Sequence, residues 1–179
     1  MKKFNLQLFA AKTAVQGKQI VYLYRILEEA ATNAATQISF VTENSKTVSK
    51  DSESTVTKDG SINTPGAPEI EISSTSILAV GDEIIPKLEQ ALLDNDIIEI
   101  WEVNLADPVS TEEGNTKFHG TYYQGYLTEF ELTASAEEAV EYSHTFAING
   151  TGAKGECTVT AEQQEMAAYV FKDTAATGA

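Results

Sequence analysis

Residues 139–149 are Ala-Val-Glu-Tyr-Ser-His-Thr-Phe-Ala-Ile-Asn, and this segment gives the clearest indication of the fold class. Apolar or aromatic side chains occupy every second position, namely Val140, Tyr142, His144, Phe146 and Ile148. Successive side chains of a β-strand point to opposite faces of its sheet, so this period of two predicts a strand with one buried and one solvated face. His144 falls on the apolar face, where we expect a core histidine with satisfied hydrogen bonds.

The chain on either side of this strand has the same β-rich character. Short runs rich in β-branched and aromatic residues are bounded by turn residues. These runs cover residues 19–27, 37–41, 69–78, 97–105, 118–134 and 157–160. We expect a polar loop with Pro108 and Gly114 before the longest run, and a Gly-rich turn over 149–155 before the last. The sequence therefore predicts a mainly β protein.

Two segments break the β pattern and predict helices. The first covers residues 83–93, where apolar positions recur at helical spacing. These positions are Ile84, Ile85, Leu88, Ala91 and Leu92. Asp82 can accept hydrogen bonds from the free amides of the first turn. We expect this helix to flank the sheet, and a short C-terminal helix to cover residues 161–170.

Residues 43–68 form a long polar segment dominated by Ser and Thr. Asp59-Gly60 is a hairpin turn signal, and the Thr/Val/Ser alternation favours an extended β-hairpin arm over a helix. The segment has too few apolar residues to build a core, so it is either a disordered loop or an arm that becomes ordered against another subunit. The candidate inter-subunit residues are Thr47, Ser49, Val56, Thr57, Lys58, Asp59, Gly60 and Ile62.

Length and charge limit the class of protein. A chain of 179 residues fits one domain over residues 1–179, and its formal net charge of -15 opposes binding to the phosphate backbone of nucleic acids. The first acidic residue is Glu28, so residues 1–18 form a short basic arm that could dock on an acidic neighbour.

The expected compartment follows from cysteine usage and hydropathy. Cys157 is the only cysteine, which rules out an intrachain disulfide and favours a reducing cytoplasm as the site of assembly. No apolar stretch approaches the length needed to span a bilayer, so we expect no membrane association.

Motifs for catalysis or cofactor binding are weak. Residues 150–155 match G-x-G-x-x-G, but a strand pattern follows instead of the helix that a dinucleotide site needs. His119, His144 and Cys157 are too few and wrongly spaced for zinc, and no G-x-S-x-G nucleophile motif occurs. We therefore expect no enzymatic activity, no cofactor and no metal.

Several short segments together resemble a known family. They are Thr-Lys-Asp-Gly at 57–60, Leu-Ala-Val-Gly-Asp at 78–82, Ile-Glu-Ile-Trp at 98–101, Tyr-Leu-Thr-Glu-Phe-Glu-Leu-Thr at 126–133 and Phe-Ala-Ile-Asn-Gly at 146–150. In this order, over residues 19–160, they resemble the major tail protein (tail tube protein) family of Gram-positive siphophages.

The resemblance implies a tail-tube-type β-sandwich or barrel that assembles as six-fold rings stacked around a tape-measure protein. It also implies a tail terminator and distal tail proteins as partners, a place in the virion, and DNA that passes through the lumen without specific binding. Our candidate lumen residues are Glu129, Glu131 and Glu141, with placement on the outer surface as the alternative. By a period of two, Glu129 and Glu131 share a strand face with Leu127 and Thr133.

Two other classes of protein remain open from the residues alone. One is an immunoglobulin-like β-sandwich that serves as a binding or adhesion module, with residues 43–68 as a variable loop. The other is a hydrolase with a nonstandard carboxylate site.

Overall fold

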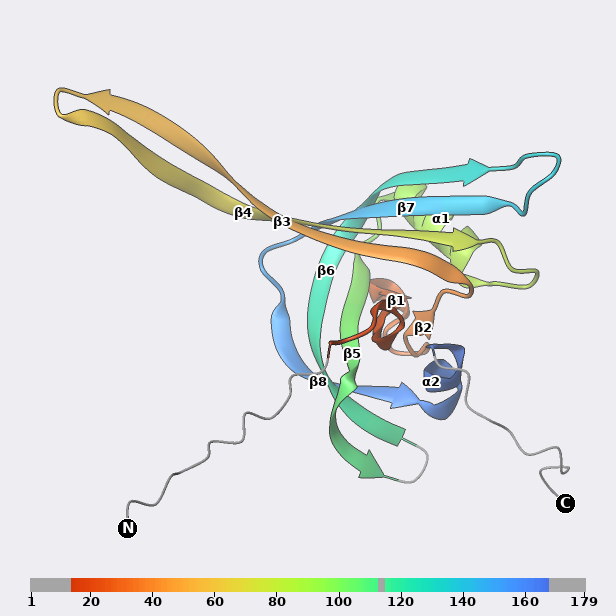
Figure 1. Cartoon of the computed structure of the whole chain (residues 1–179). Coiled ribbons are helices and arrows are strands. Elements are labelled where there is room, and N and C mark those ends of the chain that lie inside the picture. The colour runs from red at the N-terminus through yellow and green to blue at the C-terminus, as the bar shows by residue number, and fades with distance from the viewer. Residues whose placement is uncertain (1–13, 113–114, 168–179) are drawn as a thin grey trace, which may run out of the picture.

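The structure is a computed structural model that describes residues 14–112 and 115–167 (Figure 1). Eight strands form one antiparallel sheet, and two short 3-10 helices and two α-helices accompany it. The strands are β1 (Ile20–Ile26), β2 (Thr36–Gln37), β3 (Val41–Thr57), β4 (Gly60–Ile77), β5 (Ile98–Glu112), β6 (Asn115–Thr133), β7 (Glu141–Ile148) and β8 (Ala153–Thr160). The helices are η1 (Gly17–Gln19), η2 (Leu27–Glu29), α1 (Ile84–Asp94) and α2 (Ala161–Ala167). The predicted mainly β fold is confirmed.

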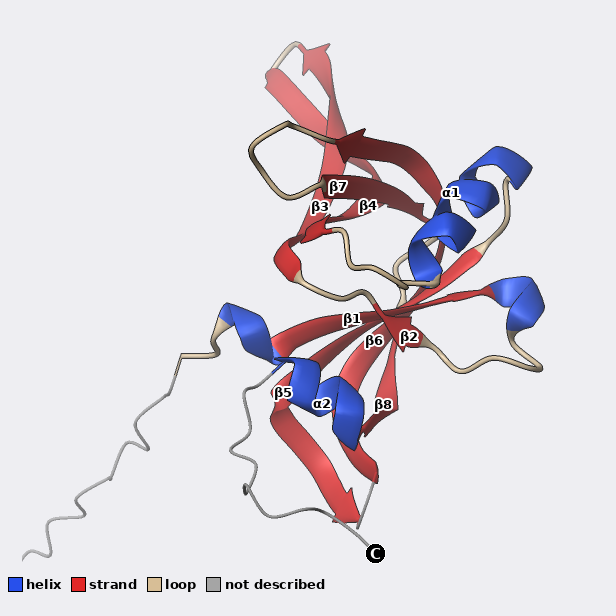
Figure 2. Ribbon diagram, turned by 90° about the vertical axis from the view of Figure 1, so that its right-hand side faces the viewer, coloured by secondary structure: helices blue, strands red, loops and turns tan. Residues whose placement is uncertain are grey.

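Strand β6 divides the sheet into two layers. The strand order is β2-β1-β5-β6-β7-β4-β3, and β8 also pairs with β6. The first part of β6 pairs with β5 and β8, and its second part pairs with β7. The half made of β3, β4 and β7 lies over the half made of β1, β5 and β8 (Figure 2).

A hydrophobic core fills the space between the layers. Side chains from β1, β4, β5, β6 and β7 meet the apolar face of α1 there. Fully buried examples are Ile72, Leu88, Ile98, Ile100 and Phe146. A smaller cluster around Val103 and Val159 packs on the other face of β1, β5 and β6. Strand β1 is therefore apolar at nearly every position because both of its faces are covered.

Helix α1 begins and ends one residue later than its pattern indicates. The Asp82 carboxylate accepts hydrogen bonds from the amides of Ile84 (3.2 Å) and Ser39 (3.2 Å). Asp82 therefore satisfies one free amide of the helix and also fastens the helix to the chain before β3. Asn95 ends the helix in the left-handed conformation, with φ of 60°.

The strand predicted over 37–41 is wrong in its extent. Only Thr36–Gln37 pair with β1, and the chain then turns before β3 begins at Val41. Phe40 has φ of 49° at this turn, which a strand cannot accommodate.

The polar loop predicted around Pro108 is also wrong. Strand β5 runs through Pro108 to Glu112, and Pro108 lies opposite Phe118 between two register shifts. Proline lacks the amide that a regular ladder needs, and such irregularities are where sheets tolerate it. The turn predicted over 149–155 is shorter than expected, because strand β8 already begins at Ala153.

The polar arm is a β-hairpin built from the distal parts of β3 and β4. It extends away from the rest of the molecule (Figure 1), and residues 51–67 are exposed on both faces. Thr57 pairs with Gly60, so Lys58 and Asp59 form the turn and Gly60, at φ of 135°, opens β4. Pairing of β4 with β7 ends at Glu71, so the hairpin leaves the sheet beyond the Thr47–Glu71 pair, and a register shift follows farther out, after Lys50.

The chain ends fall partly outside the described residues. Of the predicted basic arm over 1–18, residues 1–13 lie outside them, as do residues 168–170 of the predicted C-terminal helix. In the part of the chain that the structure describes, no helix is long and apolar enough to cross a membrane.

Candidate functional site

The solvated face of the half-sheet formed by β3, β4, β7 and the end of β6 is the most distinctive surface of the molecule. Cross-strand pairing places its residues in rows. One row is Glu131, Ser143, Thr75 and Glu43, and the next is Glu129, Thr145, Ser73 and Ser45. We call this surface the wet face.

Carboxylates are the only charged groups on the wet face among the residues that the structure describes. All three sequence-predicted candidates, Glu129, Glu131 and Glu141, lie on it and are exposed. Pairing adds three exposed carboxylates that sequence reasoning missed, which are Glu43, Glu69 and Glu71. The alternation of Glu69 and Glu71 with the apolar Ile70 and Ile72 was the signal that could have found two of them. Among the described residues on this face, none is Lys or Arg.

The predicted grouping of Leu127 with Glu129 and Glu131 is wrong. A register shift places Thr128 as an extra residue between Leu127, which faces Phe146, and Glu129, which faces Thr145. This bulge reverses the side-chain alternation, so Leu127 is 4% exposed in the core while Glu129 is on the wet face. Thr128 donates a hydrogen bond from its hydroxyl to the Thr145 carbonyl (3.1 Å).

The wet face is bounded by two strand edges that the described residues leave unpaired. One is the outer edge of β3, the last strand of the sheet. The other is the edge of β6 over 126–133 on the side away from β7, because β5 pairs with β6 only as far as Gly125. Unpaired backbone amides and carbonyls on an edge readily pair with a strand of another chain.

The opposite face of the same half-sheet carries a buried polar cluster. His144 is 1% exposed and packs against the rings of Tyr24, Tyr142 and Phe146 at centroid distances of 5.7, 5.9 and 5.1 Å. Neither ring nitrogen of His144 has a hydrogen-bond partner among the described residues, so the prediction of a satisfied core histidine is only half right. Burial lowers the pKa of His144 to about 4, and it raises the pKa of Tyr142 to about 12.

An ion pair fixes the root of the arm. The Lys46 ammonium binds the Glu102 carboxylate of β5, which also accepts a hydrogen bond from the Tyr123 hydroxyl (3.1 Å). Partial burial lowers the pKa of Lys46, but the interactions with Glu102 and Tyr123 together outweigh burial, so the pKa is raised overall. We call these contacts of Lys46, Glu102 and Tyr123 the clamp. The clamp joins the two layers at the point where β3 leaves the sheet.

The residues singled out as catalytic or metal-binding possibilities do not converge. His119 is exposed on β6, His144 lies in the core, and Gly150 and Gly152 belong to the turn between β7 and β8. Across residues 14–112 and 115–167, no group of three His, Cys, Asp or Glu side chains is arranged to hold a metal ion.

A mainly β subunit with one acidic face between two edges that the described residues leave unpaired can extend its sheet by pairing with other chains. The chain matches the model of the phage tail tube protein family over residues 14–154. It belongs to that family and is a structural component of a phage tail tube. This membership confirms the resemblance seen in the sequence and favours the tail tube role over the adhesion module.

Individual relatives agree with the family. The chain is 33% identical over 143 residues to a protein of Staphylococcus phage phiMR25 described as a tail protein, with 78% of this chain and 74% of the relative covered. Its fold is similar to that of the SPP1 tail tube, with a TM-score of 0.65 at 18% identity, covering 93% of this chain and 95% of that one. A gene transfer agent tail is similar at a TM-score of 0.59 and 10% identity, over 78% of this chain and 98% of that one.

Proposed function

We propose that this protein polymerises as stacked six-fold rings whose wet faces line a DNA-conducting lumen. The observation that carries the proposal is the acidic wet face, which two unpaired edges bound. The gene transfer agent tail, a structural neighbour, was refined with C6 symmetry.

Strand direction makes cyclic closure possible. Neighbouring strands are antiparallel across β6, β7, β4 and β3, so the two edge strands run in opposite directions. A rotation about the tube axis preserves strand direction, and β6 of one subunit therefore meets β3 of the next as an antiparallel neighbour. Each junction continues the ladder and removes two exposed edges.

The size of such a barrel suits a DNA conduit. Six copies of a four-stranded half-sheet give 24 strands. With strands about 4.8 Å apart and tilted by about 40°, the backbone diameter is roughly 50 Å. Six wet faces would surround the lumen with carboxylates, which repel the phosphate backbone, so that DNA slides without adhering.

The hairpin arm supplies the contact between rings. Its residues from Thr47 to Ile62 take no part in the hydrophobic core. The side chains of Val56 and Ile62 are 84% and 59% exposed. Apolar groups on a protruding hairpin gain stability only when another surface covers them. A tape-measure protein in the lumen, with terminator and distal tail proteins at the ends, completes the proposed tail, which assembles in the host cytoplasm.

Electron microscopy of the purified protein tests the ring proposal. We expect rings or tubes with six-fold symmetry in which β6 of one subunit abuts β3 of the next and the wet face lines the channel. Discrete monomers at all concentrations, or tubes with the wet face outside, would contradict it. Glu129 and Glu131 would then belong to an outer surface.

A further inference from the structure

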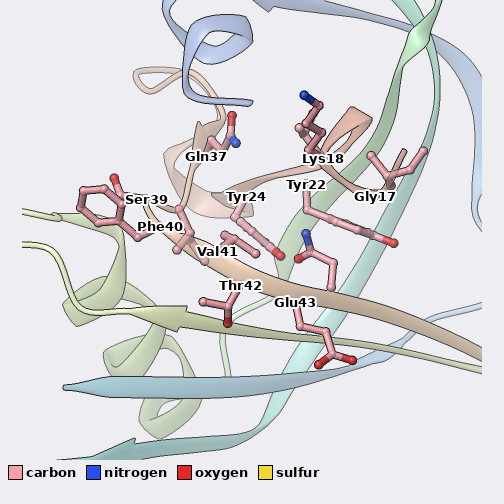
Figure 3. A pocket seen from close by; sticks show the side chains of 14 residues that line it. Gly17, Lys18, Tyr22, Tyr24, Gln37, Ser39, Phe40, Val41, Thr42 and Glu43 are labelled. Carbon is pink, nitrogen blue, oxygen red and sulfur yellow. The ribbon is translucent and has the colours of Figure 1, made fainter. Parts of the chain in front are cut away.

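A groove lies beside the β3 edge on the side away from the wet face. It has a volume of about 830 Å³ and separates β1 from the turn and strand that begin β3 (Figure 3). Its lining is mixed. Tyr22, Tyr24, Ile38, Phe40 and Val41 supply apolar surface, and Lys18, Gln37, Ser39, Thr42, Glu43 and Asn44 supply polar groups. Both walls are strand edges, because β2 covers β1 only at Leu23 and Tyr24 and nothing described covers the outer side of β3.

An exposed apolar side chain lies at the opposite edge of the same half-sheet. Leu132 is 53% exposed near the end of β6. It pairs with Tyr142, which pairs with Ser76, which in turn pairs with Val41. Leu132 and Val41 are therefore the two ends of one cross-strand row, and this row faces away from the wet face.

We propose that Leu132 of one subunit inserts into the groove beside Val41 of the neighbouring subunit. The proposal rests on the ring described above and names the side chains that specify its junction. If β6 continues the ladder at β3 with its glutamates on the wet face, alternation forces Leu132 to the other face, where the groove lies. A shift of one residue would instead bring Glu131 or Thr133 over the groove.

Phe40 forms the rim of the groove. Its φ of 49° is unusual for a bulky residue, and its side chain is 69% exposed. The Phe40 carbonyl accepts a hydrogen bond from the Ile77 amide (3.1 Å), which helps to hold the turn in this conformation. Residues in such sparsely populated conformations persist where the surrounding structure holds them, and they cluster at functional sites. Here the turn places an aromatic ring where it can cover an inserted leucine.

Substitutions on adjacent positions of β6 separate the two faces. Leu132→Gln places an amide against the apolar part of the groove, beside Val41 and Phe40, without adding charge, so we expect a tenfold or greater rise in the critical concentration for assembly. Leu132→Met preserves volume and should stay within about threefold of the parent. Thr133→Gln makes the matched change on the wet face and should also stay within threefold. Assembly of Leu132→Gln within threefold of the parent would overturn the proposal, provided that circular dichroism shows all variants folded.

Disulfide trapping identifies the occupant directly. In a Cys157→Ser background, Val41→Cys with Leu132→Cys should give a ladder of covalent oligomers up to a hexamer. Within one subunit these positions are three strand spacings apart, about 14 Å, which is too far for a disulfide. Val41→Cys with Leu8→Cys tests the N-terminal segment as an alternative occupant. A ladder from that pair and none from the first would overturn the proposal while leaving the ring intact, whereas a parent protein that never assembles would defeat the ring itself.

Discussion

At the scale of single residues, His144 carries a cost that the sequence does not reveal. Its ring lies in the core between aromatic side chains, without hydrogen-bond partners among the described residues. Such a group must stay neutral for the core to remain packed, because an imidazolium would lose its hydration without compensation. The histidine therefore links stability to pH.

We expect the protein to lose stability as the pH falls from 6.5 towards 4. The pKa of His144 is lowered from 6.5 to about 4, so the unfolded chain binds a proton that the folded chain excludes in this range. The full contribution is present above pH 6.5, and about 3 kcal/mol is lost once the pH is below 4. His144→Phe should remove this component from the pH dependence of urea unfolding. His119→Gln, at the exposed histidine, should leave it unchanged, and an unaltered pH dependence in His144→Phe would contradict the assignment.

The wet-face glutamates give a second prediction at this scale. Glu129→Lys combined with Glu131→Lys should still permit tubes to assemble, because both positions are exposed and outside the core. Phage carrying this change should eject DNA more slowly, since lysines in the lumen attract phosphate. Ejection kinetics measured by dye uptake provide the test. Glu83→Lys with Glu89→Lys makes the same charge change at exposed positions beside and on α1 and should have no effect.

At the scale of elements, the arm and the core are stabilised by different interactions. The sheet core is held by apolar burial from five strands and α1. The arm beyond Lys50 buries no apolar core and is held mainly by backbone pairing between β3 and β4, and ordering its backbone costs roughly 1–2 kcal/mol per residue. Its stability should therefore depend on a neighbouring ring.

Replacing residues 49–66 with a short Gly/Ser linker should leave a folded subunit that no longer stacks into tubes. Lys46 is outside the deletion, so the clamp to Glu102 and Tyr123 stays in place. In hydrogen exchange, the intact arm should exchange rapidly in the monomer and slowly in tubes. Full-length tubes from the shortened protein, or an arm that is already protected in the monomer, would argue against a role in stacking.

At the scale of the whole molecule, charge opposes assembly. Each subunit has a formal net charge of -15, and tube formation brings these charges together. Raising the ionic strength from 0.01 M to 0.15 M shortens the Debye length from about 30 Å to about 8 Å. We therefore expect light scattering to show faster polymerisation at the higher salt concentration. Slower polymerisation would mean that attractive ion pairs dominate the subunit contacts.

Local patterns predicted most of the elements and their type. The structure has a strand where residues 139–149 alternate and a helix where apolar residues recur from Ile84 to Leu92. It also has a hairpin where the polar arm was predicted. These features depend on neighbours a few residues away, so the sequence reports them directly. The exposed positions of Glu129, Glu131 and Glu141 also follow from local alternation, although their place in a lumen stays a proposal.

Features that depend on distant strands were not predictable. The bulge at Thr128 places Leu127 in the core, and the bulge near Pro108 extends a strand where the composition indicates a loop. The register of a pair depends on the partner strand, and no local pattern encodes an extra residue.

Composition and side-chain period are properties of short segments, so the amino-acid sequence is enough to predict a mainly β, acidic chain with a hairpin arm. Which residues share a face depends on strand pairing and is visible in the folded molecule alone. Six carboxylates from four strands gather on one surface, and Leu132 and Val41 end one row across that half-sheet, because pairing joins segments that are far apart in the chain.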